Sequence, residues 1–169
     1  MRHLALLLLF GALLTAPPSR ANSDLGAIRA AYIYNFAKYT QWPDESRGEL
    51  RLCVLGNDQP DAHIESYHGK PVRSQKLAVR QNVIMQDIPN CDIIFLPASA
   101  GRSVERARQL ISSYPILFIS EGADTVPKGA MIALTPAENR LVFDIDQSAA
   151  KQLGLKISSQ VLRLARTVY

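Results

Sequence analysis

The sequence predicts an α/β fold, namely a single three-layer α/β/α domain with a mainly parallel sheet and a β-hairpin in its C-terminal half. Two observations carry this prediction. Short continuous apolar runs at residues 50–55, 91–96 and 116–120 alternate with helical patterns, which is typical of a parallel sheet covered on both faces. Residues 141–145 instead alternate between inward-facing apolar side chains and a more polar face, which indicates a hairpin strand.

The first predicted element after the N-terminal segment is a helix that runs from Ser23 or Asp24 to Thr40. Either of the first two side chains can accept hydrogen bonds from the free N–H groups at the helix start. The dipeptide Trp42-Pro43 marks the far end, because the residue before proline avoids the helical conformation. Apolar and aromatic side chains surround this helix almost completely, so it must be buried on more than one side. Either the domain encloses it, or part of its surface contacts another protein.

The middle of the chain is predicted to alternate strands and helices. Apolar runs bounded by Gly, Asn, Asp or Pro mark the strands, and longer stretches with one polar face mark the helices. The predicted elements are strand 50–55, helix 60–67, strand 76–80, strand 91–96, helix 103–112 and strand 116–120.

The last third of the chain is predicted to form a hairpin and a terminal helix. Residues 131–135 and 141–145 form the hairpin strands, joined through residues 136–140. The terminal helix is predicted to begin near Ile157, because apolar residues recur there at helical spacing. Its apolar stripe consists of Ile157, Val161, Leu164 and Val168.

Residues 1–21 have the pattern of a cleavable secretory signal. A basic start at Arg2 precedes an apolar run over residues 4–14, and the small residues Ser19 and Ala21 favour cleavage after Ala21. The alternatives are a retained membrane anchor and a buried core helix, but the run is shorter than the roughly 20 apolar residues of a spanning helix. We therefore predict export to the periplasm or beyond, with residues 22–169 forming the mature domain.

The charge of this mature domain argues against nucleic acid as a partner. Cleavage would remove Arg2 and Arg20 and leave 17 basic against 15 acidic residues, with no basic cluster. The two cysteines, Cys53 and Cys91, are an even number in an oxidising compartment, which favours a disulfide over two buried thiols.

No pattern of catalytic or metal-binding residues stands out. The chain has no glycine-rich nucleotide-binding motif and no nucleophile elbow, so we expect no enzyme activity and no cofactor. His63 and His68 are five residues apart and would not share a helix face as metal ligands do. Asp144 and Asp146 would lie on one face of a strand, where they are either an acid/base pair or, as we favour, the solvated face of an outer strand.

A possible ligand site lies where the predicted parallel strands end. Ligands of open α/β sheets bind outside the carboxyl ends of the strands. The segments that follow these ends supply Asn57, Asp58, Ser99, Arg102 and Glu121. The free N–H groups of the helix near Arg102 could hold an anion, although an ordinary capped turn has the same residues.

Four segments of the chain carry a family resemblance. They are AAYIYNFAKY at residues 30–39 with Trp42-Pro43 after it, LRLCVLGND at 50–58, CDIIFL at 91–96 and GLKISSQVLRLAR at 154–166. Together they resemble the YfiR family, in the same order and over essentially the whole mature chain. The first and last segments are the specific ones.

This resemblance implies a regulator in the periplasm of Gram-negative bacteria. YfiR-like proteins bind the periplasmic part of a membrane diguanylate cyclase of the YfiN type and hold it inactive. An OmpA-like outer-membrane lipoprotein of the YfiB type sequesters the repressor, and such proteins tend to form homodimers. Cys53 and Cys91 match the family's disulfide positions, whereas the second cysteine pair of some members is absent from this chain.

The resemblance also implies that some apolar side chains of the first and last predicted helices form dimer or partner surfaces. The alternative is that they pack in the core. The candidate interface residues are Tyr32, Tyr34, Phe36, Tyr39, Leu164 and Val168. Two other functions stay open. One is a small-ligand binding module that serves a membrane sensor such as a histidine kinase, and the other is a hydrolase that uses Asp144 and Asp146.

Overall fold

The computed structural model describes residues 20–44, 48–56, 59, 61–122, 126, 129–138 and 140–169, and it describes side chains from Leu25 onward except at positions 101 and 102. The predicted signal therefore lies almost entirely outside the described residues. Among the described residues, no helix has both the length and the apolar composition needed to cross a membrane.

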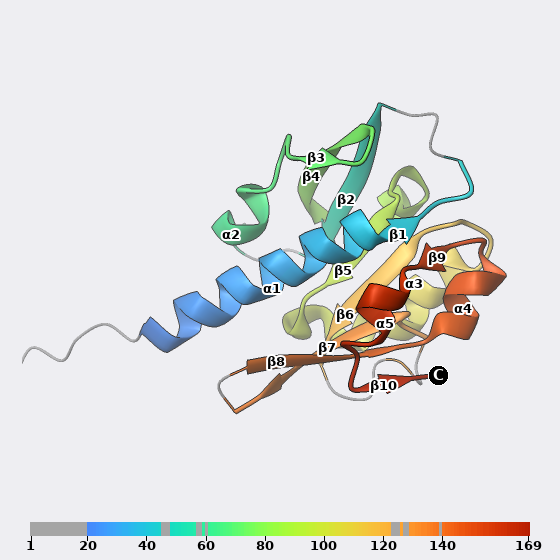
Figure 1. Cartoon of the computed structure of the whole chain (residues 1–169). Helices are drawn as coiled ribbons and strands as arrows, with labels where there is room; N and C mark the ends of the chain where they lie inside the picture. The colour runs from blue at the N-terminus through green and yellow to red at the C-terminus, as the bar shows by residue number, and fades with distance from the viewer. Residues whose placement is uncertain are drawn as a thin grey trace, which may run out of the picture.

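A mixed sheet of eight strands forms the centre of the fold (Figure 1). Its order is β10-β8-β7-β6-β5-β2-β4-β3, and β4, β2, β5, β6 and β7 run parallel to one another. β8 pairs antiparallel with β7, and β3 pairs antiparallel with β4. The strands of this sheet are β2 (Glu49–Leu55), β3 (Pro71–Val72), β4 (Gln75–Val83), β5 (Ile93–Leu96), β6 (Leu117–Glu121), β7 (Ile132–Ala137), β8 (Arg140–Ile145) and β10 (Thr167–Val168).

Helices cover both faces of the sheet, as the predicted three-layer fold requires. A separate two-stranded ribbon, β1 with β9, ties the end of α1 to the segment before α5. The remaining elements are α1 (Arg20–Tyr39), β1 (Thr40–Gln41), α2 (Ala62–Glu65), η1 (Met85–Asn90), η2 (Ala98–Ser103), α3 (Val104–Ile111), α4 (Gln147–Gln152), β9 (Lys156–Ile157) and α5 (Ser159–Leu162).

The central strands are apolar at every position because each of their two faces meets a different helical layer. In β5, Ile93 and Phe95 face the layer of α1, whereas Ile94 and Leu96 face the layer of η1 and α3. All four side chains are buried. Figure 1 shows α1 crossing one face of the sheet and α3 lying behind the other. The continuous apolar runs therefore predicted the layers correctly.

The long terminal helix predicted from Ile157 is wrong. The chain forms β9, then the short helix α5, and then β10 at the sheet edge, where it pairs with β8. The Ser158 hydroxyl accepts a hydrogen bond from the Gln160 N–H and so starts α5 anew. Four residues beyond the last turn, Arg166 forms an ion pair with Asp144 of β8, which favours an added strand over a continued helix.

Short elements that depend on tertiary contacts were missed or misjudged in length. α4 was not predicted, although the Asp146 carboxylate caps it by accepting a hydrogen bond from the Ala149 N–H. β4 extends to Val83, beyond its predicted end at residue 80. The predicted helix 60–67 contains only the four residues of α2 in helical form, followed by turns. α1, α3 and the β7–β8 hairpin are confirmed.

Candidate functional site

An apolar groove lies between α1 and α5, and we call it the α1–α5 groove. Its volume is about 380 Å³. At its floor the ring of Phe143 meets the rings of Tyr32 and Phe36 edge-on, with centroids 5.4 and 5.0 Å apart. Its rim is open, since Tyr39 is 39% and Leu164 is 73% exposed. The lining residues are Tyr32, Asn35, Phe36, Tyr39, Phe143, Gln160, Val161 and Leu164.

This groove brings together four of the six predicted interface residues. Tyr32, Phe36, Tyr39 and Leu164 line it, although Leu164 comes from the turn after α5 rather than from a long helix. Such a surface combines a rigid aromatic floor with exposed apolar groups at its rim. These properties suit a protein contact, because the free energy falls when a partner removes exposed apolar area from water.

The other two predicted interface residues lie elsewhere. The Tyr34 hydroxyl donates a 2.7 Å hydrogen bond to the Pro71 carbonyl, and its ring stacks on Tyr67 at 4.7 Å. This side chain therefore fastens α1 to β3 and to the turn after α2. Val168 lies in β10 at the sheet edge and is 43% exposed. Sequence reasoning missed Phe143 and Gln160 as groove residues, because only the tertiary fold places them beside α1.

Only two of the five predicted strand-end ligand residues have described side chains, namely Ser99 and Glu121. Asn57 and Asp58 lie outside the described residues, as does the side chain of Arg102. Ser99 is exposed in η2. Glu121 lies at the end of β6, where its carboxylate accepts hydrogen bonds of 3.0 and 3.2 Å from the Arg29 guanidinium.

The Arg29 guanidinium joins α1 to two other elements. It donates hydrogen bonds to Glu121 of β6 and to Asp61, the N-cap of α2. Burial alone would lower the pKa of Arg29, but hydrogen bonds and the charges of the two carboxylates outweigh it and raise the pKa overall. At this edge of the sheet the predicted ligand residue Glu121 is thus engaged in fixing α1.

The carboxylates of Asp144 and Asp146 both have structural partners. Asp144 is 7% exposed, because β10 covers the edge of β8 and places Arg166 beside it. The hydrogen bond from Arg166 is the main reason that the pKa of Asp144 lies below its ordinary value. The prediction of a solvated outer face is therefore wrong, because it took β8 for the edge strand.

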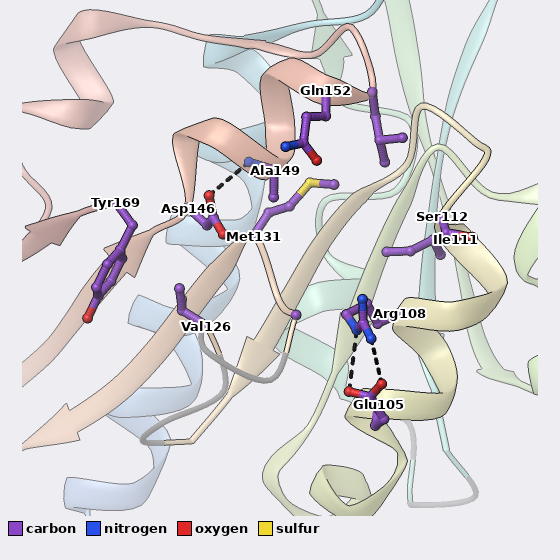
Figure 2. A pocket seen from close by; sticks show the side chains of 12 residues that line it. Glu105, Arg108, Ile111, Ser112, Val126, Met131, Asp146, Ala149, Gln152 and Tyr169 are labelled. Atoms are coloured by element: carbon purple, nitrogen blue, oxygen red, sulfur yellow. Dashed lines mark hydrogen bonds and ion pairs between the residues drawn. The ribbon is translucent and has the colours of Figure 1, made fainter.

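A larger hollow of about 540 Å³ lies between α3 and α4 (Figure 2). Figure 2 shows two interactions within the protein at its walls. Glu105 pairs with Arg108 at 2.7 Å, and Asp146 accepts from the Ala149 N–H at 2.8 Å. Arg108 also lies over Gly129, where an added Cβ would come within 1.7 Å of its Cδ. The first pair lies within α3 and the second caps α4, so Glu105 and Asp146 both have structural partners.

The two histidines of the predicted mature domain, His63 and His68, also have structural surroundings. A Cβ at Gly26 would lie 2.9 Å from Cδ2 of His63, so α1 passes close to this ring. Nδ1 of His68 accepts a 3.2 Å hydrogen bond from the Val79 N–H. Among the residues described, no three His, Cys, Asp or Glu side chains gather in a group that could hold a metal ion.

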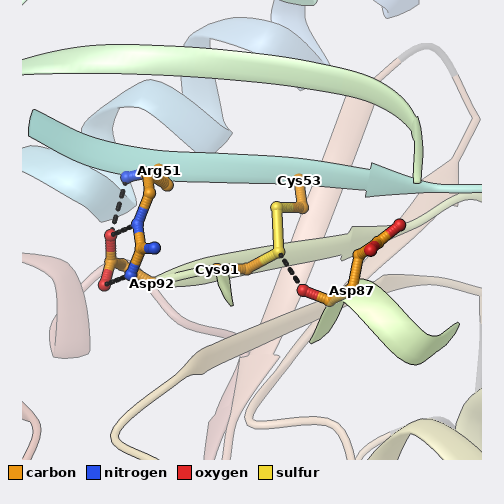
Figure 3. Close-up of a disulfide and its surroundings, with 5 residues drawn as sticks. All are labelled: Arg51, Cys53, Asp87, Cys91 and Asp92. Atoms are coloured by element: carbon orange, nitrogen blue, oxygen red, sulfur yellow. Dashed lines mark hydrogen bonds and ion pairs between the residues drawn. A yellow bond between two sulfur atoms is a disulfide. The ribbon is translucent and has the colours of Figure 1, made fainter. Parts of the chain in front are cut away.

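A disulfide joins Cys53 of β2 to Cys91, which follows η1 (Figure 3). The two cysteines are 1% and 3% exposed and belong to the core beneath η1 and α3. Nearby, Arg51 of β2 pairs with Asp92, and its backbone N–H and Nε both donate to Asp92 Oδ2 at 2.9 Å. The predicted disulfide is therefore confirmed, and an ion pair beside it also connects β2 to the start of β5.

Comparisons with known proteins agree with this fold. The YfiR/HmsC-like family model matches residues 26–166. The crystal structure of a conserved domain protein from Vibrio cholerae O1 biovar El Tor strain N16961 is similar, with a TM-score of 0.54 and 14% identity over 83% of this chain and 60% of that one. This chain thus spans about 60% of that protein's length, and at this identity the similarity concerns the fold alone.

A second solved structure is more distant. It is the ABC domain from Streptococcus pneumoniae in complex with L-Trp, with a TM-score of 0.45 and 13% identity over 71% of this chain and 55% of that one. So low a similarity carries no argument about this chain. The comparison with curated proteins finds no match.

Proposed function

Because this chain belongs to the YfiR/HmsC-like family, we propose that it is a periplasmic repressor of a membrane-bound diguanylate cyclase. It would bind the periplasmic part of a YfiN-like cyclase, lower cyclic di-GMP and so reduce biofilm formation. A YfiB-like outer-membrane lipoprotein would relieve this repression by sequestering the protein. The disulfide fits an oxidising compartment such as the periplasm.

The observation that supports action by protein contact is the α1–α5 groove. Leu164 has the highest exposure among the large apolar side chains described, and Tyr39, which is also exposed, lines the same groove. The packed rings of the floor fix the shape of the surface before a partner binds. Binding therefore costs little conformational entropy of these side chains. We propose this groove as the contact surface for the cyclase or for a second copy of the chain.

The test of the function is cellular cyclic di-GMP in a deletion strain. Complementation uses the full gene or a version that lacks residues 1–21. A rise on deletion that only the exported form reverses is the expected result. No rise, with expression and export of the wild type verified, would overturn cyclase repression.

The groove has its own test in the variant Leu164→Glu. A charge at this exposed position leaves the core intact but opposes burial against a partner, so we expect repression to weaken at least tenfold. Leu110→Glu is the matched control, since Leu110 is also an exposed leucine, at 39%, but lies on α3 in the opposite layer. Equal repression by both variants would remove the groove from the interface. The molar mass of each variant in solution would show whether the same surface forms a homodimer.

A further inference from the structure

A second hollow lies at the carboxyl ends of β2, β4 and β5, on the side of the sheet covered by η1 and α3. Its volume is about 430 Å³, within the range of small-molecule sites. Leu55, Val83 and Leu96 form its floor, and all three are buried. We call it the strand-end hollow, and it is separated from the α1–α5 groove by the sheet itself.

An irregularity in strand pairing shapes this floor. Cys53 pairs with Arg80, but Leu55 pairs with Val83, so β4 contains one extra residue there. The extra residue leaves Asn82 in a left-handed conformation with φ +56°, which is uncommon for a residue with a side chain. β-Bulges are rare between parallel strands and are frequent beside functional sites, where they redirect a side chain. Here the bulge precedes Val83, which lines the hollow.

The start of α3 contributes a polar and a positively charged side chain to the lining. Ser103 and Arg106 both line the hollow and are one helical turn apart, so they lie on the same side of α3. Ser103 is the N-cap of α3, but its hydroxyl makes no capping hydrogen bond, whereas Asp61, Asp146 and Ser158 cap their helices. Arg106 has no carboxylate partner among the described residues.

We propose that the strand-end hollow binds a medium-chain aliphatic carboxylate. The carboxylate group would pair with the Arg106 guanidinium and accept a hydrogen bond from the Ser103 hydroxyl. The alkyl chain would lie on Leu55, Val83 and Leu96, where it leaves water for an apolar surface. This floor holds no aromatic ring on which a planar ligand could stack, and the flexible Met85 beside it adapts to an unbranched chain. Binding here would be independent of the α1–α5 groove.

The experiment titrates the purified mature protein with octanoate and follows its backbone amide signals by NMR. For a ligand of this size we expect a Kd on the order of 0.1–1 mM, with shifts centred on Gly56, Ile84 and Ser103. Arg106→Gln should raise the Kd about tenfold, and Arg106→Lys should restore part of the affinity because it restores the charge. Octanamide, which has the same chain without the charge, should bind about tenfold more weakly.

Two further variants keep the test decisive. Ala100→Phe places a large ring at the wall of the hollow and should abolish binding, while an unchanged melting temperature would show that the fold is intact. Arg163→Gln, at the end of α5 in the other layer, should leave the Kd unchanged. The proposal is overturned if octanoate fails to bind at about ten times the expected Kd. It is also overturned if Arg106→Gln and Ala100→Phe bind like the wild type, or if only Leu164→Glu loses binding.

Discussion

The two helical layers are attached to the sheet by different means. On the α1 side, 25 buried residues form the core among those described, and the rings of Phe36 and Phe143 meet near its edge. On the η1 and α3 side only 13 buried residues pack together, and the bridge between Cys53 and Cys91 joins the sheet to that layer. The larger layer is therefore held by packing, whereas the smaller layer depends on a covalent bond.

This difference bears on where the protein can offer a surface. The layer held by packing does not bury all of its apolar side chains. Tyr39 and Leu164 remain exposed at the rim of the α1–α5 groove. The smaller layer of η1 and α3, which the disulfide attaches, instead has hollows lined by charged side chains, such as the strand-end hollow with Arg106. We infer that the layer of α1 serves protein contacts and that the layer of η1 and α3 serves small ligands.

The largest effect should come from opening a cavity in the packed layer. Phe36 is 2% exposed, so Phe36→Ala should lower the free energy of unfolding by about 4 kcal/mol, through lost burial and an unfilled space. Urea denaturation monitored by circular dichroism measures this loss. Ile28→Ala on the same helix is the control, because Ile28 is 38% exposed and its truncation should cost less than about 1 kcal/mol. Similar losses in the two variants would mean that α1 is not held by packing at Phe36.

Breaking the bridge should have the next largest effect. The bond closes a loop of 38 residues, which corresponds to about 3–4 kcal/mol in the chain-entropy model. The double variant Cys53→Ser, Cys91→Ser should therefore melt about 10 °C lower than the wild type. A reducing agent should lower the melting temperature of the wild type and leave the double variant unchanged. If neither treatment shifts the melting temperature, packing alone holds the smaller layer.

The ion pairs of Arg29 should contribute less to stability than either the packing of Phe36 or the disulfide. Arg29→Gln leaves Asp61 and Glu121 near one another without their shared cation, and it should cost about 2 kcal/mol because these groups are only partly exposed. Arg108→Gln is the control, since the pair of Arg108 with Glu105 lies at the surface, where solvent screens it, and its loss should have a much smaller effect. Chemical denaturation of both variants gives the comparison. An equal cost for the two would show that the attachment of α1 does not depend on this cluster.

How much the sequence could predict also differs between the layers. Apolar runs such as residues 91–96 predicted the central strands. A strand buried on both faces is apolar at every position, and this pattern can be recognised without knowing which helices cover it. The aromatic face of α1 was visible for the same reason. The presence of Phe143 in the groove was not, because it depends on where α1 crosses the sheet.

The C-terminal segment shows where such patterns mislead. The spacing of Ile157, Val161, Leu164 and Val168 fits a helix, yet only the first two are buried. The pairing of Arg166 with Asp144 outweighs that periodicity and turns the chain into an edge strand. A contact between residues 22 positions apart leaves no local signal, and the same contact is why β8 was mistaken for the outer strand.

This contact supplies the smallest effect and a test by pH. The guanidinium of Arg166 is half-exposed, so Arg166→Gln should cost about 1 kcal/mol at pH 7, mostly by leaving the buried Asp144 with fewer hydrogen bonds. The hydrogen bond from Arg166 lowers the pKa of Asp144 in the folded state below its value of about 3.9 in the unfolded chain. Stability from this group is therefore present above that pH and is lost as the pH falls through the lower, folded-state pKa.

The difference in unfolding free energy between wild type and Arg166→Gln should accordingly stay constant from about pH 7 to pH 5 and shrink below about pH 4. Urea titrations at pH 7 and pH 3 measure it. The matched background is Asp144→Asn, in which the replacement of Arg166 should have little effect at either pH, because the charge that depends on it is gone. If the cost of Arg166→Gln is the same at both pH values and persists in that background, Arg166 fastens β10 through its alkyl chain rather than through Asp144. The edge of the sheet would then be held by packing, like the layer of α1.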